Sequence, residues 1–435
     1  MKNKQLLTAF LLLAAQQLFF LLAFSPFTEP DSAGYVSVAL QYLGSGGLGA
    51  ESRLPGYPAF LSFFYLLFGH TDLPVIIAQH VLGLVLWFAL VRTLETDRQK
   101  LIFSGLYFCD LLFNSYQHAI LSDFFFSLLL CLSAWAAWLY GRDGQRRWIL
   151  LCGLFIAAGT LTKPALRLYP FFALPFFLLD RRPLKSRLAA AGLFLAAPLL
   201  AMNLWSLRNY LDKGYYALLP LESYHYVGRV VNHLEFPAGS AAKPYFLANL
   251  PAGRAARDQK APVVHAAVAA MKAAGVPAEA MDADFRSIFR LSILRRPFSY
   301  MKESAVELFY FFFSAHNLYA KFGLADRLPV SAESGLRSGQ AGAVLLKVAV
   351  SMHPFYWLVF ALLAWFTAVN ARLLLSGGNF FLAYAYSLIL YISLVSSMAN
   401  EGLARYRLAI QPLMLVIAAL ALARLFPGRA DGGGR

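Results

Sequence analysis

The chain has 435 residues, of which 59% are hydrophobic and only 14% are charged, and its mean hydropathy is +0.57. A soluble chain of this length would carry about a quarter charged residues, so the composition excludes a soluble multidomain protein, a disordered chain and a disulfide scaffold. It predicts an integral membrane protein with many spans. Basic loops that orient such spans explain the net charge of +15 better than nucleic-acid binding does.

The first predicted element is a long apolar run behind the basic start MKNK. Residues 6–24 are long enough to cross about 30 Å of hydrocarbon, and we interpret them as a retained span with the N-terminus in the cytoplasm. Alternate short loops, chiefly 95–100, 141–147 and 181–187, collect the basic residues and are therefore predicted to be cytoplasmic. Further apolar runs give about ten spans in all, at residues 74–94, 101–113, 119–140, 148–162, 168–179, 188–207, 343–369, 380–398 and 406–425.

Two apolar segments are expected to lie on the outer membrane face as juxtamembrane helices. Residues 57–68 are too few to cross the bilayer, and a crossing would move the basic loops that follow to the wrong side. Residues 305–319 receive the same interpretation, although their aromatic run FYFFF would also suit a span. Residues 284–296 have a helical pattern, with Phe285 and Ile288 on one side.

These patterns predict an all-α polytopic membrane protein in three parts. Residues 1–207 form a transmembrane module whose first outer loop is 25–73, residues 208–342 form a mostly helical outer domain, and residues 343–435 form the last spans. The cytoplasmic loops are too short for a nucleotide-binding domain, and no phosphate-binding GxxxxGK[ST] motif occurs. We therefore expect chemistry on the outer side, with an activated substrate carried by a membrane lipid.

The metal-binding residue types show no ligand spacing. The three cysteines lie in apolar stretches and the eight histidines form no HxxxH pair, so no residue is assigned to a metal. No cofactor is certain, and a divalent metal stays open.

Polar residues gather at the outer loops and the outer ends of the spans. Carboxylates beside cations at one membrane face suit transfer of a group from a phosphate leaving group to a hydroxyl acceptor. Each residue also has a structural explanation, because acids favour helix starts and cations and tyrosines anchor the interface. The residues are Glu29, Asp31, Tyr35, Arg53, Tyr57, His118, Asp123, Lys163, Arg167, Arg405 and Arg407.

Five short sequence motifs carry a resemblance to a known family. The motifs are P-D-S-A-G-Y at 30–35, R-L-P-G-Y-P-A-F-L at 53–61, L-S-D at 121–123, G-T-L-T-K-P at 159–164 and R-Y-R at 405–407. With these motifs in this order, the chain resembles the GT-C glycosyltransferases, specifically bacterial relatives of protein O-mannosyltransferases and of the lipid A aminoarabinose transferase. The central residues 208–340 show no such resemblance.

The resemblance implies a GT-C-like enzyme of the bacterial inner membrane with its active site on the periplasmic side. The lipid donor would be a polyprenyl-phosphate-linked sugar, hexose or pentose, and the acceptor a glycan, lipid A or a protein, with inversion at the sugar. Asp31 stands where the family has its first-loop catalytic acid. Because this chain has Asp-Ser where many relatives have Asp-Glu, Glu29 or Asp123 is expected to supply a second acid.

The resemblance also suggests substrate-binding residues. Arg53 stands where the family places a basic contact to the phosphate, since a guanidinium pairs with two oxygens at once. Tyr35 and Tyr57 could stack on a sugar. The remaining predicted binding residues are Lys163, Arg167, His118, Arg405 and Arg407.

Two other classes of protein stay as alternatives. An O-antigen ligase or polymerase also uses lipid-linked sugars, but we expect it to lack the motifs around Asp31 and Arg53. A lipid or sugar transporter should show interrupted or polar spans at mid-depth and internal repeats, whereas here the charges lie at the outer ends. The sequence alone identifies neither the sugar nor the acceptor.

Overall fold

The computed structural model describes residues 2–45, 53–253, 255, 259–315, 353–375, 379–399 and 403–426. The described residues are almost entirely helical, with one isolated parallel β-bridge between Phe27 and Ala119, which confirms the predicted all-α class. The chain divides into two compact units. The first holds Met1–Ala201, Phe312–Ile392 and Ala404–Arg435, and the second holds Met202–Phe311 and Ser393–Leu403.

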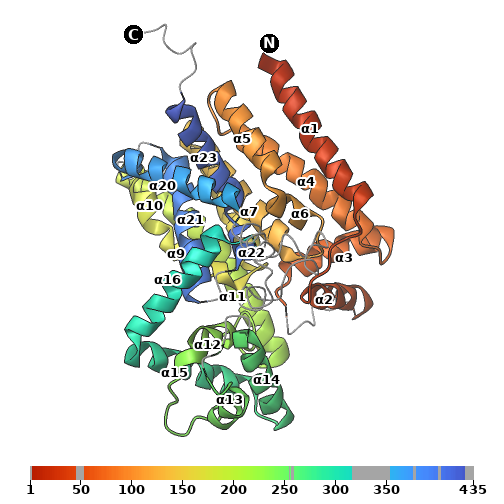
Figure 1. Cartoon of the computed structure of the whole chain (residues 1–435), viewed down its shortest axis with the longest axis vertical. Helices are drawn as coiled ribbons and strands as arrows, with labels where there is room; N and C mark the ends of the chain where they lie inside the picture. Colours follow the sequence, from red (N-terminus) through yellow and green to blue (C-terminus); the bar gives the residue numbers. More distant parts are fainter. Residues whose placement is uncertain are drawn as a thin grey trace, which may run out of the picture. The chain divides into compact units, whose positions relative to one another are not determined.

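The first unit is a bundle of apolar helices (Figure 1). Helix α1 packs on α4 and α5, α7 packs on α4 and α8, and α23 packs on α5 and α20. Its elements are α1 Lys2–Ala23, α2 Ser32–Ser45, α3 Gly56–Phe68, α4 Leu73–Val91, α5 Asp97–Cys109, α6 Leu111–Gln117, α7 Ser122–Asp143, α8 Arg146–Thr160, η1 Pro164–Leu166, α9 Tyr169–Phe172, α10 Leu174–Leu178, α20 Pro354–Leu375, α21 Phe380–Met398, α22 Ala404–Arg407 and α23 Gln411–Leu425.

Six described helices are long and apolar enough to cross a membrane, namely α1, α4, α7, α11 (Leu184–Lys213), α20 and α21. They correspond to six of the predicted spans and show a multi-pass membrane protein. The other four predicted spans correspond to shorter helices, α5, α8, α9 with α10, and α23, so the number ten stays a prediction. The first part of the predicted span 343–369 lies outside the described residues.

The first loop contains two helices, α2 and the expected α3. Helix α3 covers the predicted 57–68 segment, begins behind Pro55 and ends at Gly69, whose φ of 76° lies in the left-handed region that favours glycine. Its place on the membrane face stays a prediction.

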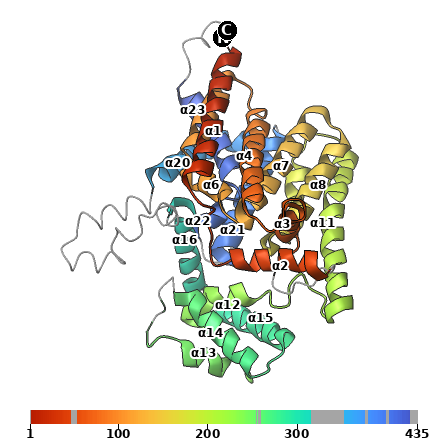
Figure 2. The same ribbon diagram turned by 90° about the vertical axis from the view of Figure 1, so that its right-hand side faces the viewer.

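The second unit is a small helical domain (Figure 2). Its apolar core includes Phe246, Met271 and Phe285. Helix α15 contains nearly all of the segment predicted from its pattern at 284–296, and α11, α16 and α21 contribute residues to both units. The elements are α12 Tyr224–Val230, η2 Val231–His233, α13 Lys243–Asn249, α14 Lys260–Ala273, α15 Ala278–Arg295 and α16 Pro297–Phe313.

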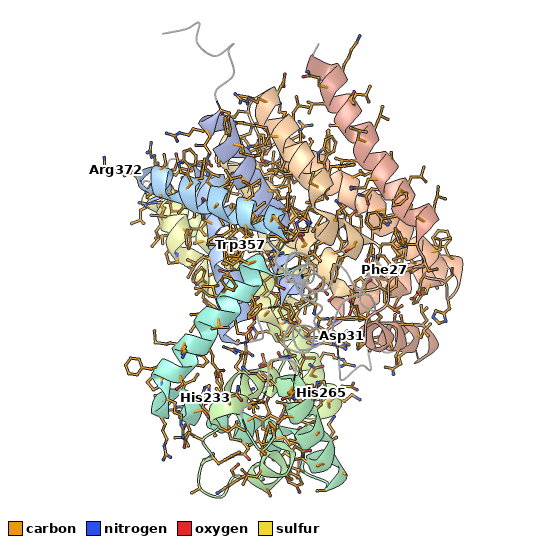
Figure 3. The ribbon with its side chains drawn as sticks, in the orientation of Figure 1. Phe27, Asp31, His233, His265, Trp357 and Arg372 are labelled. Carbon is orange, nitrogen blue, oxygen red and sulfur yellow. The ribbon has the colours of Figure 1, made fainter. Side chains whose placement is uncertain are left out.

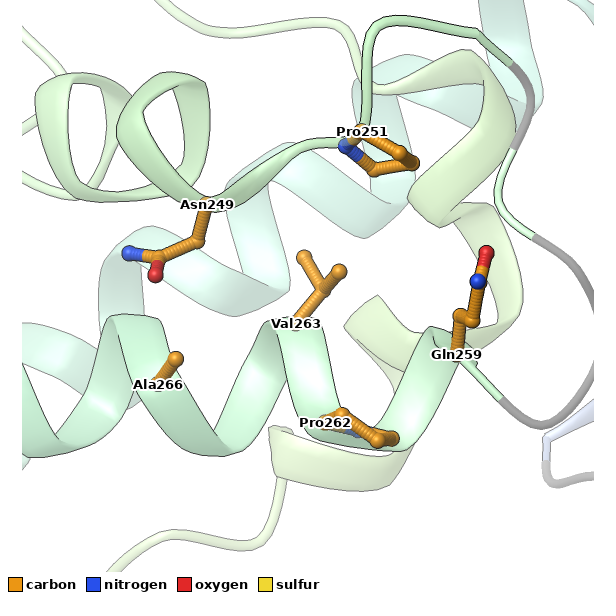
Figure 4. Close-up of a pocket in the computed structure, with 6 residues that line it drawn as sticks. All are labelled: Asn249, Pro251, Gln259, Pro262, Val263 and Ala266. Atoms are coloured by element: carbon orange, nitrogen blue, oxygen red, sulfur yellow. The ribbon is translucent and has the colours of Figure 1, made fainter.

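The second unit also contains a hollow of 270 Å³ beside α14 (Figure 4). None of its lining side chains is ionisable, so this hollow offers no group for acid–base chemistry. The lining residues are Asn249, Pro251, Gln259, Pro262, Val263 and Ala266.

Candidate active site

The centre of the site is Asp31, which immediately precedes α2 in the first unit (Figure 3). Its Oδ1 accepts a hydrogen bond from Nη2 of Arg53 at 2.8 Å, and its Oδ2 accepts one from Nη2 of Arg405 at 2.9 Å. The side chains of Asp31, Arg53 and Arg405 are 31%, 29% and 20% exposed. The charges are therefore paired with each other and still accessible to a ligand.

The two arginines control the protonation of Asp31. Partial burial alone would raise its pKa, but the positive charges of Arg405 and Arg53 outweigh burial and lower the pKa from 3.8 to about 2. At neutral pH the Asp31 carboxylate is therefore ionised and, in this arrangement, a weak base.

The P-D-S-A-G-Y motif at the start of α2 holds Arg53 in place. Asp31 and Tyr35 are four residues apart and share one helix face, and the Arg53 guanidinium lies 4.7 Å from the centre of the Tyr35 ring. A Cβ at Gly34 would lie 3.0 Å from Nε of Arg53, so glycine leaves room for this side chain. The Tyr35 hydroxyl is hydrogen-bonded to Ser122 Oγ at 2.8 Å.

A second ion pair stands beside the first. Nζ of Lys163 donates to Oδ1 of Asp123 at 2.7 Å, and the Asp123 side chain is only 4% exposed. The Lys163 ammonium lies 5.6 Å from the centres of the Phe126 and Tyr406 rings, which favours the cation by cation–π attraction. Because Tyr406 is the neighbour of Arg405, the two ion pairs are adjacent.

Gly56 brings two of the motifs together, those at 53–61 and 159–164. The backbone N–H of Gly56 donates to the carbonyl of Leu161 at 2.8 Å, and a Cβ on Gly56 would lie 2.3 Å from Oγ1 of Thr162. Only glycine permits this approach, which brings the start of α3 beside the segment that carries Lys163. All five motifs therefore lie together in one part of the first unit.

Tyr57 and His118 support the site from the core. Tyr57 is fully buried, packs edge-on against Tyr35 at 5.2 Å and donates to Oε1 of Gln79 at 3.1 Å. His118 is buried with Nδ1 2.9 Å from Nε2 of His80, and its carbonyl accepts from the N–H of Phe27 in the first loop. Their predicted contact with substrate stays a prediction.

Arg407 lies in a different environment from Arg405. It is fully buried, donates to the carbonyl of Ser314 at 3.0 Å and to Oε1 of Gln411 at 2.9 Å, and lies 4.0 Å above the Tyr356 ring. Its guanidinium therefore serves the bundle interior, and its predicted role in binding stays a prediction. Charge and spacing gave no signal that would separate the two arginines.

Glu29 and Arg167 stand at the margins of the site. Glu29 lines an open groove of 520 Å³ together with Ser32, Val36 and Asp72, on a different face of α2 from Asp31. Arg167 follows η1 and is partly exposed. Both stay predictions as functional residues.

Gly34, Gly56 and Ser122 are site residues that sequence reasoning did not single out. All three lie within the motifs that carry the resemblance, and their place in these motifs could have identified them. Within the described part of the chain, no three His, Cys, Asp or Glu side chains are grouped so that they could hold a metal ion.

The fold and the site define a multi-pass helical membrane protein with a partly exposed, charged centre. Residues 52–205 match the family model described as Dolichyl-phosphate-mannose-protein mannosyltransferase. Residues 52–205 are thus similar to this mannosyltransferase family, and the predicted resemblance is confirmed over this segment. No curated protein sequence matches the chain.

Two solved structures are similar to the chain, both of ArnT from Cupriavidus metallidurans. One is bound to Undecaprenyl phosphate, with 15% identity, 96% of this chain and 78% of ArnT covered, and a TM-score of 0.37. The other is the apo state, with 17% identity, coverage of 97% and 77%, and a TM-score of 0.40. These TM-scores are too low to establish a common overall fold.

Proposed function

We propose that the protein is a glycosyltransferase of the bacterial inner membrane that transfers a sugar from a polyprenyl-phosphate-linked donor to a periplasmic acceptor. The observation that carries this proposal is the convergence of Arg53 and Arg405 on Asp31. It places two guanidinium groups beside a carboxylate, in a chain whose residues 52–205 match the mannosyltransferase family model.

The cations suit a phosphate ligand. Guanidinium groups form strong, directional bonds to phosphate oxygens, and the nearby Lys163 supplies a third positive charge. Among the described residues, no acceptor contacts the buried Nε–H of Arg405. A buried donor without an acceptor is costly, and a phosphate oxygen would satisfy it.

The charge of the cluster favours a monophosphate over a diphosphate. Arg53, Arg405 and Lys163 face Asp31 and Asp123, which leaves one positive charge in excess. A lipid-phosphate sugar is a phosphodiester with one negative charge, whereas the diphosphate donors of ligases and polymerases carry two. This balance supports the glycosyltransferase over the ligase alternative.

The reaction needs a base and a good leaving group. The acceptor oxygen attacks the anomeric carbon, the bond from that carbon to the phosphate oxygen breaks, and the lipid phosphate leaves with the bonding electrons. The acceptor proton passes to a carboxylate. Asp31 is the better placed of the two acids because its side chain is more exposed than that of Asp123.

A donor panel tests the proposal. Purified protein in proteoliposomes receives the same labelled sugar on a polyprenyl monophosphate, on a polyprenyl diphosphate and on a nucleotide, with an extract of cell-envelope glycans and lipids as acceptor. We expect transfer only from the monophosphate. Transfer from the diphosphate would instead support the ligase alternative, and transfer from the nucleotide would contradict both.

A further inference from the structure

The Asp31 carboxylate makes the same kind of bonds with Arg53 and Arg405 that a phosphate would make. Each of its oxygens accepts one charge-assisted hydrogen bond, from a different guanidinium. Aromatic rings limit the movement of both arginines, since Arg53 lies 4.7 Å from the Tyr35 ring centre and Arg405 lies 5.3 Å from that of Tyr406. An incoming phosphate therefore needs the same guanidinium donors that already bind Asp31, because the arginines cannot move far from it.

The same contacts oppose the use of Asp31 as a base. Two guanidinium groups hold its pKa at about 2, and a base this weak accepts a proton from a hydroxyl poorly. A phosphate that takes over the arginines would remove the opposite charges from Asp31 and add a like charge beside it. Both changes make the carboxylate a stronger base.

We propose that Asp31 and the phosphate of the lipid donor compete for the guanidinium groups of Arg53 and Arg405, so that binding of the lipid donor releases Asp31 to act as the base. This inference rests on the proposed function. It makes proton removal conditional on a loaded site, because the base becomes effective only when the leaving group is in place.

Phosphate binding to the Asp31→Asn variant tests this competition. Undecaprenyl phosphate and inorganic phosphate serve as probes, and their dissociation constants are measured on the full-length protein in detergent. Asparagine keeps the shape but accepts weaker bonds, so we expect both probes to bind about tenfold more tightly than to wild type, while transfer is lost. Glu29→Gln removes a carboxylate two residues away and controls for long-range charge.

Each outcome has a separate meaning. Weaker or unchanged binding of both probes to Asp31→Asn overturns the competition and makes Asp31 a residue that positions the arginines. An equal gain in Glu29→Gln also overturns it, because general charge then explains the effect. Tighter binding of inorganic phosphate alone supports the competition but contradicts the lipid donor of the proposed function.

Helix α16 of the second unit carries an independent inference, because its polarity is inside out. Glu303 and Glu307 lie four residues apart on its buried face. Glu303 accepts a hydrogen bond from Lys260 at 3.0 Å, and Glu307 lies 3.7 Å from Nη1 of Arg229. Both acidic residues of the helix therefore face the protein.

The opposite face of α16 is exposed and mostly apolar, and it also carries the exposed Lys302, whose long side chain can reach from the apolar region to a lipid headgroup. Phe298 is 85% exposed and Met301 is 65% exposed, and Val306 and Phe309 are exposed on the same side. In water this arrangement would leave large apolar side chains uncovered. In contact with lipid it is the expected one, since polar groups then turn inward and pair.

The position of α16 favours a lipid surface as the partner of this face. The hydroxyl of Tyr300 donates to the carbonyl of Met398, the last residue of the candidate span α21, at 2.7 Å. Arg295 and Arg296, just before α16, are more than half exposed and share the single carboxylate of Glu235, so one positive charge is left in excess there and suits anionic headgroups. We infer that the Phe298–Phe309 face of α16 is immersed in the outer leaflet of the bilayer.

Spin labels test the lipid contact in reconstituted full-length protein. In a Cys109→Ala background, a nitroxide is attached at Ala305→Cys on α16 or at Ala269→Cys on α14; both alanines are exposed. We expect collisions with oxygen to exceed those with a water-soluble nickel chelate at 305, and the reverse at 269. The inference fails if position 305 matches position 269, or if labels at 305 show dipolar broadening from a second copy.

Discussion

Replacement of Arg53 by alanine should weaken binding of the lipid donor without unfolding the protein. The side chain is 29% exposed, so its loss opens no cavity in the core. A hydrogen bond to a charged group contributes about 1.5–3 kcal/mol, and partial exposure favours the lower end. A loss of about 1.5 kcal/mol corresponds to roughly tenfold weaker binding.

Arg53→Lys should recover only part of this loss. Lysine keeps the charge but lacks the forked geometry and the planar contact that the guanidinium makes over Tyr35. The assay measures the KM for the lipid donor and the dissociation constant of undecaprenyl phosphate. Arg142→Ala, an exposed arginine that also lies over an aromatic ring (that of Trp138, at 4.8 Å) but stands in a loop predicted to be cytoplasmic, is the matched control and should leave both constants unchanged. Wild-type values for Arg53→Ala, with an unaltered melting temperature, would refute the phosphate contact.

Three further substitutions separate the site from its support. Gly56→Ala should cost about 2 kcal/mol or more through overpacking against Thr162, seen as a lower melting temperature, whereas Gly105→Ala, with open space around its Cβ, should not. Lys163→Met leaves the nearly buried Asp123 unpaired and should lower both stability and transfer; adding Asp123→Asn should restore the melting temperature but not transfer. Arg407→Met should lower the melting temperature by breaking buried bonds, and the affinity of the folded fraction for undecaprenyl phosphate then tests the predicted binding role separately.

The residues of the site were largely predictable from the sequence because they lie in motifs that resemble those of a known family. Asp31, Arg53, Asp123, Lys163 and Arg405 do lie together. Their pairing was not predictable, since each contact joins segments that are remote along the chain. Hydrogen bonds of this kind depend on the three-dimensional packing of the bundle.

The role of the aromatic residues also depended on packing. Sugar stacking by Tyr35 and Tyr57 stays a prediction, whereas their contacts were not predictable from type and position: Tyr35 lies against Arg53, and the buried Tyr57 donates to Gln79. Arg405 and Arg407 are two residues apart on the short helix α22, so they point in different directions. Hydropathy could not show which of them faces Asp31.

The span count was limited by proline. Residues 168–179 read as one apolar run, but Pro170 and Pro175 each stand near the start of a separate short helix, α9 and α10. Proline removes a backbone donor and favours the first turn, so the run is divided. Hydropathy does not detect this interruption.

The most direct test of the central claim is to map where the phosphate of the lipid binds. A polyprenyl phosphate with a photoreactive group next to its phosphate is cross-linked to the purified protein, and the labelled peptides are identified by mass spectrometry. The account predicts labels in the peptides that carry Arg53, Lys163 and Arg405, and competition by unlabelled undecaprenyl phosphate. Labelling confined to other parts of the chain, such as the hollow beside α14, would contradict it.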